Sequence, residues 1–384
     1  MEIDTLLKLM VDKKASDLFV TEGVPPSIKI NGKIMPVGKS PLNSTHTRTL
    51  VESVMDEKQK AVFHDTHELN FAIASDNVVG ARFRVSAFYQ RNEVGMILRR
   101  IETEIPTTKD LLLPPILEEL VMVKRGIIFF VGATGTGKST SLAALIGHRN
   151  RNSKGHIISI EDPIEFVHQH QGCIITQREV GIDTESFEVA LKNTLRQAPD
   201  VILIGEIRST ETMENAITFA ETGHLVLATL HANNANQALD RIQHFFPADR
   251  HSQLWMDLSL NLRAMVAQQL IPTIDGNGRR AAIEILINTP LVSDIIRKGD
   301  VHKLKELMSR STEQGMQTFD HALYTLFKEG SISYEDALAA ADSKNDLRLL
   351  IKLQSDSDTD YLDDAADDFS MSEDEDEGTR VFQR

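Results

Sequence analysis

Residues 132–139 read Gly-Ala-Thr-Gly-Thr-Gly-Lys-Ser, which fits the phosphate-loop pattern G-x-x-x-x-G-K-[ST]. Glycines in such a loop let backbone N–H groups wrap a phosphate, and the helix that follows adds the positive end of its dipole. Lys138 would reach the β- and γ-phosphates of ATP, and Ser139 would hold Mg²⁺. The sequence therefore predicts a site for ATP and Mg²⁺. The predicted cofactor-binding residues are Gly132, Thr134, Gly135, Thr136, Gly137, Lys138, Ser139 and Thr140.

An acidic residue, Glu206, follows the apolar residues 201–204, which read as a buried strand. In phosphate-loop enzymes such a strand lies beside the loop, and its terminal acid meets Mg²⁺ or the water bound to the metal. We therefore predict that Glu206 and Ser139 serve the magnesium ion, Glu206 through a water molecule.

Three acids, Glu161, Asp162 and Glu165, follow a second apolar segment at residues 157–160. The ends of strands are where α/β sheets place their ligands, and a carboxylate there can orient or deprotonate an attacking water. Glu161 is our predicted general base, and a solvated turn is the alternative interpretation of this cluster. The sequence leaves open an exchange of roles between Glu161 and Glu206.

Two histidines, His224 and His231, flank the apolar residues 225–230. In an extended segment they lie at opposite ends, so they cannot bind one metal ion from one face. We predict that His231 donates a hydrogen bond to the γ-phosphate, and a purely structural histidine is the alternative.

The elements that must position these residues form an α/β domain. Short apolar runs alternate with helical stretches, as expected for parallel strands covered on both faces. The runs are residues 127–131, 157–160, 201–204 and 225–228, and a helix is predicted at 139–146. Residues 291–353 are also predicted to be helical.

A smaller α+β module precedes this domain. Residues 2–13 have the apolar spacing of an amphipathic helix, and Asn31-Gly32 indicates a hairpin turn. Strands are predicted at residues 17–21, 27–30, 33–37, 80–89 and 94–100. Prolines indicate a stiff linker between the module and the α/β domain. The predicted divisions are the module 1–101, the linker 102–116, the α/β domain 117–354 and an acidic disordered tail 355–384.

Composition and charge limit the class of protein. The chain has 384 residues, of which 41% are hydrophobic and 25% charged, enough for two or three globular domains. A single cysteine, Cys173, excludes an internal disulfide framework and a four-cysteine zinc site. The acidic start lacks the basic region of a secretory signal, and residues 222–239, the longest stretch without a charged side chain, are too polar for a membrane span. We therefore expect a cytoplasmic protein.

The net charge of −15 is concentrated at the end of the chain, because residues 355–384 hold twelve acids and two arginines. The remainder is only mildly acidic, which disfavours a dedicated nucleic-acid binder. The tail is expected to be either a solubilising segment or an arm that docks a partner.

These motifs, in this order, resemble those of the secretion ATPases of the type II and type IV pilus class. Residues 132–140 are similar to the Walker A box, 161–165 to the Asp box, 200–208 to the Walker B box and 222–231 to the His box. Further segments, residues 15–18, 23–26, 177–179 and 315–318, are similar to the type IV pilus retraction ATPases, the PilT/PilU family. Residues 231–237 favour the PilU branch. The resemblance covers roughly residues 1–345.

The resemblance implies a homo-hexameric ring whose subunits have a PAS-like amino-terminal domain and a RecA-like ATPase domain. It implies that ATP lies between these domains, with arginines supplied from the amino-terminal domain, and Arg82, Arg84 and Arg99 match that region. It also assigns His224 to the cofactor site. The implied function is a motor for pilus retraction and twitching motility, at the cytoplasmic face of the inner membrane. Its implied partners are a PilT-like primary retraction ATPase and an inner-membrane platform protein, through which alone it would meet the membrane.

Two other functions remain open at this stage. An accessory ring subunit that binds ATP but turns over little is favoured by the acidic tail and by an altered motif at residues 291–298. A nucleic-acid motor is disfavoured by the acidic balance and by the lack of interleaved aromatic and basic residues.

Overall fold

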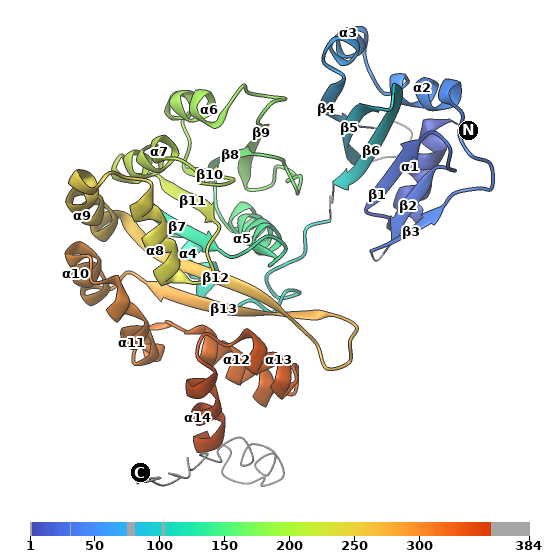
Figure 1. Ribbon diagram of the computed structural model, residues 1–384. Coiled ribbons are helices and arrows are strands. Elements are labelled where there is room, and N and C mark those ends of the chain that lie inside the picture. The colour runs from blue at the N-terminus through green and yellow to red at the C-terminus, as the bar shows by residue number, and fades with distance from the viewer. Residues whose placement is uncertain (1, 31, 75–80, 102–103, 355–384) are drawn as a thin grey trace, which may run out of the picture.

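The computed structural model describes residues 2–30, 32–74, 81–101 and 104–354, and these residues form two separate sheets, one in each half of Figure 1. The fold is therefore α/β with an antiparallel sheet in the amino-terminal module and a mixed sheet in the larger part. The larger sheet positions the predicted phosphate loop and its acidic partners.

The amino-terminal module is a six-stranded antiparallel sheet in the order β3-β2-β1-β6-β5-β4. Buried and partly exposed residues alternate along β5, so one face of the sheet packs on three helices (Figure 1). The strands are β1 (Asp17–Thr21), β2 (Ser27–Ile30), β3 (Lys33–Pro36), β4 (Glu68–Ala74), β5 (Arg82–Gln90) and β6 (Glu93–Ile101). The helices are α1 (Ile3–Asp12), α2 (Ser44–Glu52) and α3 (Glu57–Thr66).

The larger sheet has seven strands in the order β13-β12-β7-β11-β10-β8-β9. Neighbouring strands run parallel except β12 and β13, which are antiparallel. The strands are β7 (Gly126–Val131), β8 (Gly155–Glu161), β9 (Cys173–Glu179), β10 (Val201–Ile204), β11 (Leu225–Leu230), β12 (Leu262–Pro272) and β13 (Arg279–Ile287). The central strands β7, β10 and β11 are buried along their whole length, because helices cover both faces.

Helices divide between the two faces of this sheet (Figure 1). On one face lie α4 (Ile116–Val121) and α5 (Lys138–Asn152), which share a core with the strands. The opposite core includes α6 (Phe187–Thr194), α7 (Thr210–Glu221), α8 (Ala235–His244) and α9 (His251–Asn261). It continues into α10 (Pro290–Lys298), α11 (Leu304–Ser309), α12 (Phe319–Lys328), α13 (Tyr334–Ala340) and α14 (Lys344–Gln354). Short 3₁₀ turns are η1 (Leu195–Gln197), η2 (Ala248–Arg250), η3 (Val301–Lys303) and η4 (Thr312–Gln314).

The strand order corrects one prediction. β10, which ends before Glu206, does not lie beside the phosphate-loop strand β7, because β11 lies between them. The four strands are parallel, so β7, β11, β10 and β8 all end at one edge of the sheet. The strand that leads to His231 therefore separates the phosphate loop from Glu206.

Most predicted elements are confirmed. The strand at 201–204 and the amino-terminal helix are observed, and the helix predicted at 139–146 extends to Asn152. β4, β9, β12 and β13 were not predicted. In β12 the polar Gln268 and Gln269 interrupt an apolar run, and β9 is polar after its first three residues. Neither segment therefore has the alternation of apolar and polar residues that indicates a strand. The predicted hairpin is confirmed, because β2 and β3 pair antiparallel with Ile30 opposite Lys33. Asn31, Gly80, the first two linker residues and the tail 355–384 lie outside the described ranges.

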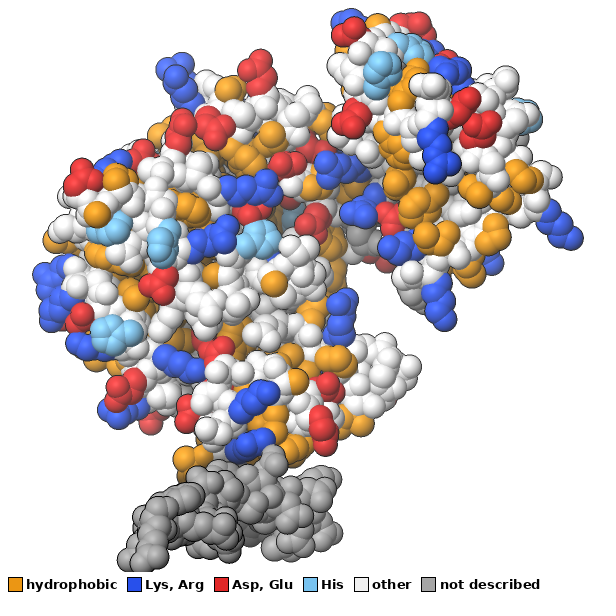
Figure 2. Space-filling model, in the orientation of Figure 1, with side chains coloured by type: hydrophobic (Ala, Val, Ile, Leu, Met, Phe, Trp, Pro, Cys, Tyr) orange, Lys and Arg blue, Asp and Glu red, His pale blue; other side chains and the backbone are white. Residues whose placement is uncertain are grey.

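Among the described helices, none combines the length and the apolar character needed to cross a membrane. On the face drawn in Figure 2, acidic and basic side chains are intermixed, with hydrophobic side chains between them.

Candidate active site

A cavity of about 520 Å³ lies where the parallel strands of the larger sheet end. This volume is in the range of small-molecule sites. The phosphate loop follows β7, Glu161 ends β8, Glu206 follows β10 and His231 follows β11, so the sheet brings four separate motifs to one place. The predicted residues that line the cavity are Thr134, Gly135, Gly137, Lys138, Ser139, Thr140, Glu161, Glu206 and His231.

Glycines fix the shape of the phosphate loop. A Cβ at Gly132 would lie 2.5 Å from Thr136 Oγ1 and 2.8 Å from the Gln268 carbonyl oxygen. Gly137 has a φ of +84°, and a Cβ there would lie 2.8 Å from Gln268 Nε2. The Thr136 hydroxyl donates to the Ala133 carbonyl oxygen at 2.9 Å. Gly132 and Thr136 do not line the cavity; they shape the loop from behind it.

Gln268, on β12, holds the loop against the sheet. Its side chain is buried, its Nε2 donates to the Thr136 carbonyl oxygen at 2.9 Å, and its Oε1 accepts from Ser141 Oγ at 2.8 Å. One amide therefore joins the loop to the first turn of α5. Gln268 was not predicted from the sequence, although it interrupts an otherwise apolar stretch of β12.

Lys138 lies within the loop. Its Nζ donates to the carbonyl oxygens of Gly132, at 2.7 Å, and Ala133, at 2.8 Å. Burial lowers the pKa of Lys138, and the negative charges of Glu206 and Glu165 act in the opposite direction. A partly desolvated ammonium at the start of a helix is suited to attract phosphate oxygens.

Ser139 lies beside one of the acids that follow β8. Its Oγ donates to Glu165 Oε1 at 2.9 Å, and both residues line the cavity. Glu165 belongs to the acidic cluster noted in the sequence, but it was not assigned to the site. The contact places a carboxylate next to the hydroxyl that is predicted to hold Mg²⁺.

Glu161 is held by two neutral donors. Its Oε1 accepts from Ser159 Oγ at 2.6 Å and from Gln177 Nε2 at 3.2 Å. Burial raises the pKa of Glu161, and these two hydrogen bonds lower it. Gln177, on β9, also donates to the Phe166 carbonyl oxygen at 2.9 Å, so it fixes the segment that follows β8. The result is an oriented carboxylate with a raised proton affinity.

Glu206 lies between a histidine and an arginine. His231 Nε2 is 3.1 Å from Glu206 Oε1, and Arg208 contacts Oε2 through Nε at 2.7 Å and Nη2 at 2.6 Å. The hydrogen bond to Glu206 raises the pKa of Arg208. Arg208 was not predicted as a site residue. Its position two residues after Glu206 is the feature of the sequence that could have identified it.

Gly205 sets the distance between the two strands that carry the glutamates. Its N–H donates to the Ile160 carbonyl oxygen at 2.7 Å. A Cβ at Gly205 would lie 3.0 Å from Glu161 Cα and 3.0 Å from the Ile160 oxygen. The glycine before Glu206 is therefore required by the close approach of β10 and β8.

His224 lies outside the cavity. It precedes β11 at the opposite edge of the sheet, where its Nδ1 is 3.1 Å from the Phe219 carbonyl oxygen. Six strand residues separate it from His231, a distance of about 23 Å in an extended chain. His224 does not line the cavity of the described chain, so its contact with a cofactor stays a prediction.

The predicted arginines lie on the amino-terminal sheet. Arg82 and Arg84 are on β5 and Arg99 is on β6, where Arg84 pairs directly with Arg99 across the strands. Arg99 Nε donates to Asp17 Oδ1 at 2.8 Å. None of the three lines the cavity within the described chain, so their contact with ATP stays a prediction.

The cavity residues fit a nucleotide. The loop offers backbone N–H groups, an ammonium and a helix start for phosphates, and Phe166, Phe187 and Leu270 supply apolar surface. The described residues contain no group of three or more His, Cys, Asp or Glu side chains arranged to hold a metal. Mg²⁺ would therefore depend on the Ser139 hydroxyl, on Glu206 through water and on the phosphates, which is how this ion is usually held beside nucleotides.

Comparison with known sequences gives full-length relatives. Residues 3–316 match the family described as Type II/IV secretion system protein. The chain is 68% identical over 383 residues to the Type IV pilus ATPase PilU of Pseudomonas aeruginosa, with 100% of both chains covered. It is 39% identical over 337 residues to the Type IV pilus retractation ATPase PilT of the same organism, which covers 88% of this chain and 97% of the relative.

Comparison with solved structures gives matches over most of the chain. The crystal structure of the pilus retraction motor PilT with bound ADP matches with a TM-score of 0.85 and 39% identity, over 91% of this chain and 99% of that one. The Legionella pneumophila ATPase DotB matches with a TM-score of 0.74 and 27% identity, over 88% and 95% of the two chains.

Proposed function

Because the chain belongs to the family of type II/IV secretion system proteins, in its PilT/PilU branch, we propose that it is a Mg²⁺-dependent motor of the type IV pilus machine that powers or assists pilus retraction and twitching motility. The family makes the chain an ATPase. The observation that carries the assignment of the active site is the meeting of Lys138, Glu161, Glu206 and His231 in one cavity.

The binding step uses the phosphate loop. Lys138 exchanges the carbonyl oxygens of Gly132 and Ala133 for phosphate oxygens, and the N–H groups at the start of α5 contribute further donors. Ser139 and Glu206 are the residues that would hold Mg²⁺, which supplies positive charge to the phosphates.

The hydrolytic step uses the acids and the histidine. Glu161 accepts the proton of the attacking water at its carboxylate, because burial has raised its affinity for a proton. Glu206 already contacts Arg208 and His231 through its two carboxylate oxygens, which favours a metal-binding or sensing role for Glu206. His231 holds its Nε2 toward Glu206 and offers that nitrogen to the γ-phosphate.

The motor function requires a ring. We propose a homo-hexamer of subunits with a PAS-like module, a linker at residues 102–116 and a RecA-like ATPase domain. Arg82, Arg84 and Arg99 lie outside the cavity of their own chain, and ring closure would bring them to a nucleotide. Guanidinium groups there would neutralise charge on the transferring phosphoryl group.

The proposed setting is the cytoplasmic face of the inner membrane at the base of the pilus. The partners are a platform protein of that membrane and a PilT-like retraction ATPase, and nucleic acid is not among them. The support for a partner ATPase is the acidic tail at residues 355–384 and the altered motif at residues 291–298. These features favour a second candidate, an accessory ring subunit with little turnover of its own.

Steady-state ATP hydrolysis distinguishes the motor from the accessory ring subunit. We would compare the wild type with Lys138→Ala at protein concentrations that span assembly of the ring. Lys154→Ala, at an exposed position beyond the end of α5, is the matched control. Activity that rises with assembly and is lost only in Lys138→Ala supports the motor. Tight ATP binding with negligible turnover supports the accessory subunit, and full activity in Lys138→Ala contradicts the assigned site.

A further inference from the structure

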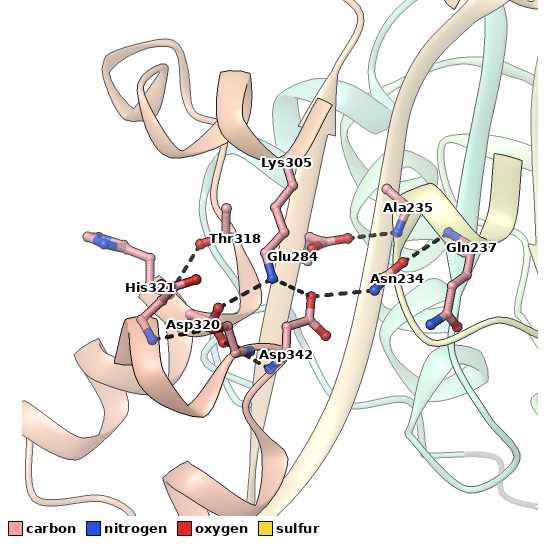
Figure 3. A network of polar contacts seen from close by, with 11 residues as sticks. Asn234, Ala235, Gln237, Glu284, Lys305, Thr318, Asp320, His321 and Asp342 are labelled. Carbon is pink, nitrogen blue, oxygen red and sulfur yellow. Dashed lines mark hydrogen bonds and ion pairs between the residues drawn. The ribbon is translucent and has the colours of Figure 1, made fainter. Parts of the chain in front are cut away.

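Glu284 is a buried carboxylate that no step above uses. It lies on β13, is 3% exposed, and its Oε1 accepts a hydrogen bond from the backbone N–H of Ala235 at 2.7 Å (Figure 3). Ala235 is the first residue of α8 and follows His231 by four positions. A methionine would fill similar space without the cost of burying a charge, so the carboxylate is retained at an energetic cost.

A second contact holds the adjacent residue. Asn234 caps α8 through its Oδ1, which accepts from the Gln237 N–H at 3.0 Å, while its Nδ2 donates to Asp342 Oδ2 at 3.4 Å. Asp342 lies between α13 and α14. The start of α8 is therefore tied to β13 at one residue and to the carboxy-terminal helices at the residue before it (Figure 3).

Lys305, on α11, joins the carboxy-terminal helices to this contact. Its Nζ is 3.2 Å from Asp342 Oδ2 and 3.4 Å from Asp320 Oδ2, on α12. Asp320 Oδ1 also accepts the N–H of Asp342 at 2.9 Å. In Figure 3 the side chains of Lys305, Asp320 and Asp342 lie together near the start of α8. A shift of α11 or α12 would therefore move Asp342 through these contacts.

We propose that Glu284 and Asp342 form a two-point clamp on the start of α8, and that this clamp sets the position of His231 against Glu206. The inference rests on the proposed ATP hydrolysis at the cavity. Only residues 232–234 separate His231 from the clamped Ala235, so a displacement of the helix start changes the 3.1 Å contact between His231 and Glu206. The carboxy-terminal helices thereby control the hydrolytic step without touching the nucleotide.

The charged side chains around Glu284 affect the pKa of its carboxyl group. Its pKa is raised to about 7: burial raises it most, the hydrogen bond from Ala235 lowers it, Asp342 and Asp320 raise it, and Lys305 lowers it. Movement of Lys305 or Asp342 would change the charge on Glu284 and so the strength of its bond to α8.

A double-mutant cycle tests the clamp. We expect Glu284→Met to lower kcat for ATP about tenfold with KM changed less than about twofold, because the phosphate loop lies on β7 and α5. Glu284→Gln keeps an acceptor for the Ala235 N–H and should restore most of the activity. In a His231→Ala background Glu284→Met should have no further effect. Effects that multiply in the double variant, or a Glu284→Gln variant as slow as Glu284→Met, would overturn the proposal.

Hydrogen exchange tests the clamp without relying on hydrolysis. In the Lys138→Ala variant, Glu284→Met should speed exchange at the Ala235 amide by about tenfold or more, while amides in the middle of α5 keep their protection and report that the fold is intact. Unchanged exchange at Ala235 would overturn the clamp. Faster exchange in a protein whose wild type hydrolyses no ATP would instead contradict the proposed function and leave the clamp in place.

Discussion

Replacing Gly205 by alanine should slow ATP hydrolysis and leave nucleotide binding nearly unchanged. The added Cβ would lie 3.0 Å from Glu161 Cα and 3.0 Å from the carbonyl oxygen of Ile160. Both are backbone atoms of β8, so no side chain can turn aside to make room. The strand that carries Glu161 must therefore move away from the strand that leads to Glu206.

The size of the effect follows from this geometry. Carbon atoms reach their best separation at about 3.5–4.0 Å, so β8 must retreat by a few tenths of an ångström. Overpacking of this kind destabilises a protein by about 1–3 kcal/mol. A misplacement of about 1 Å can cost a factor of about 100 in rate, so we expect kcat to fall about tenfold. KM should change less than about twofold, because β11 separates β10 from the phosphate-loop strand β7.

The assay is steady-state ATP hydrolysis together with calorimetric titration of ADP. Gly147→Ala is the matched control: it lies in α5, where a Cβ meets only the flexible end of Arg151 at 3.3 Å. We expect that variant to be as active as the wild type and slightly more stable, because alanine favours helix. A folded Gly205→Ala variant with an unchanged kcat, or with weaker ADP binding and normal kcat, would refute the reasoning.

Three other outcomes are expected. Gln268→Leu removes both hydrogen bonds that hold the phosphate loop, so ADP affinity should fall about fivefold and the free energy of unfolding by about 1–3 kcal/mol. Calorimetric titration of ADP and denaturation measure these two quantities. The control variant Gln269→Leu, one residue further along β12, should change ADP affinity little. Gln177→Leu removes a hydrogen bond that lowers the pKa of Glu161, so the acid limb of the kcat profile should move to higher pH, and a limb that stays in place argues against Glu161 as the base. The pKa of Glu284 is raised from 4.5 to about 7, so between these pH values the folded state holds a proton that the unfolded state has lost. The folded protein therefore loses about 3 kcal/mol of stability as the pH rises from 4.5 to 7. Denaturation across this pH range should show that Glu284→Gln lacks this loss.

Local sequence identified those parts of the site that depend on local geometry. The phosphate loop is one continuous segment, and Glu161, Glu206 and His231 each come at or directly after the end of an apolar run. A parallel sheet places all such ends at one edge, so these residues could be grouped before the strand order was known. His224 precedes its strand and lies at the opposite edge of the sheet, so its assignment to the cofactor site rests on the resemblance.

The parts that could not be predicted are set by pairing between distant segments. The insertion of β11 between β7 and β10 leaves no trace in any one strand. Gln268 bonds to Thr136, which is 132 positions earlier in the sequence, and Gln177 bonds to Glu161, which is 16 positions earlier. Neither glutamine belongs to a phosphate-binding pattern. Arg208 is near Glu206 in sequence, but its role depends on the side-chain conformation that turns it back toward the carboxylate.

The position of β7 has a consequence for the synthesis of the protein. β7 pairs with β11 on one side and with β12 on the other, and both strands are made long after the phosphate loop has left the ribosome. Pairing between segments so far apart is slow compared with the formation of a local helix such as α5. A nascent chain that ends before residue 225 carries the complete loop sequence, but it has neither neighbouring strand, nor His231, nor the Gln268 amide that holds the loop. We therefore expect unfinished chains to bind ATP weakly, so that tight binding marks a subunit whose translation has passed β12.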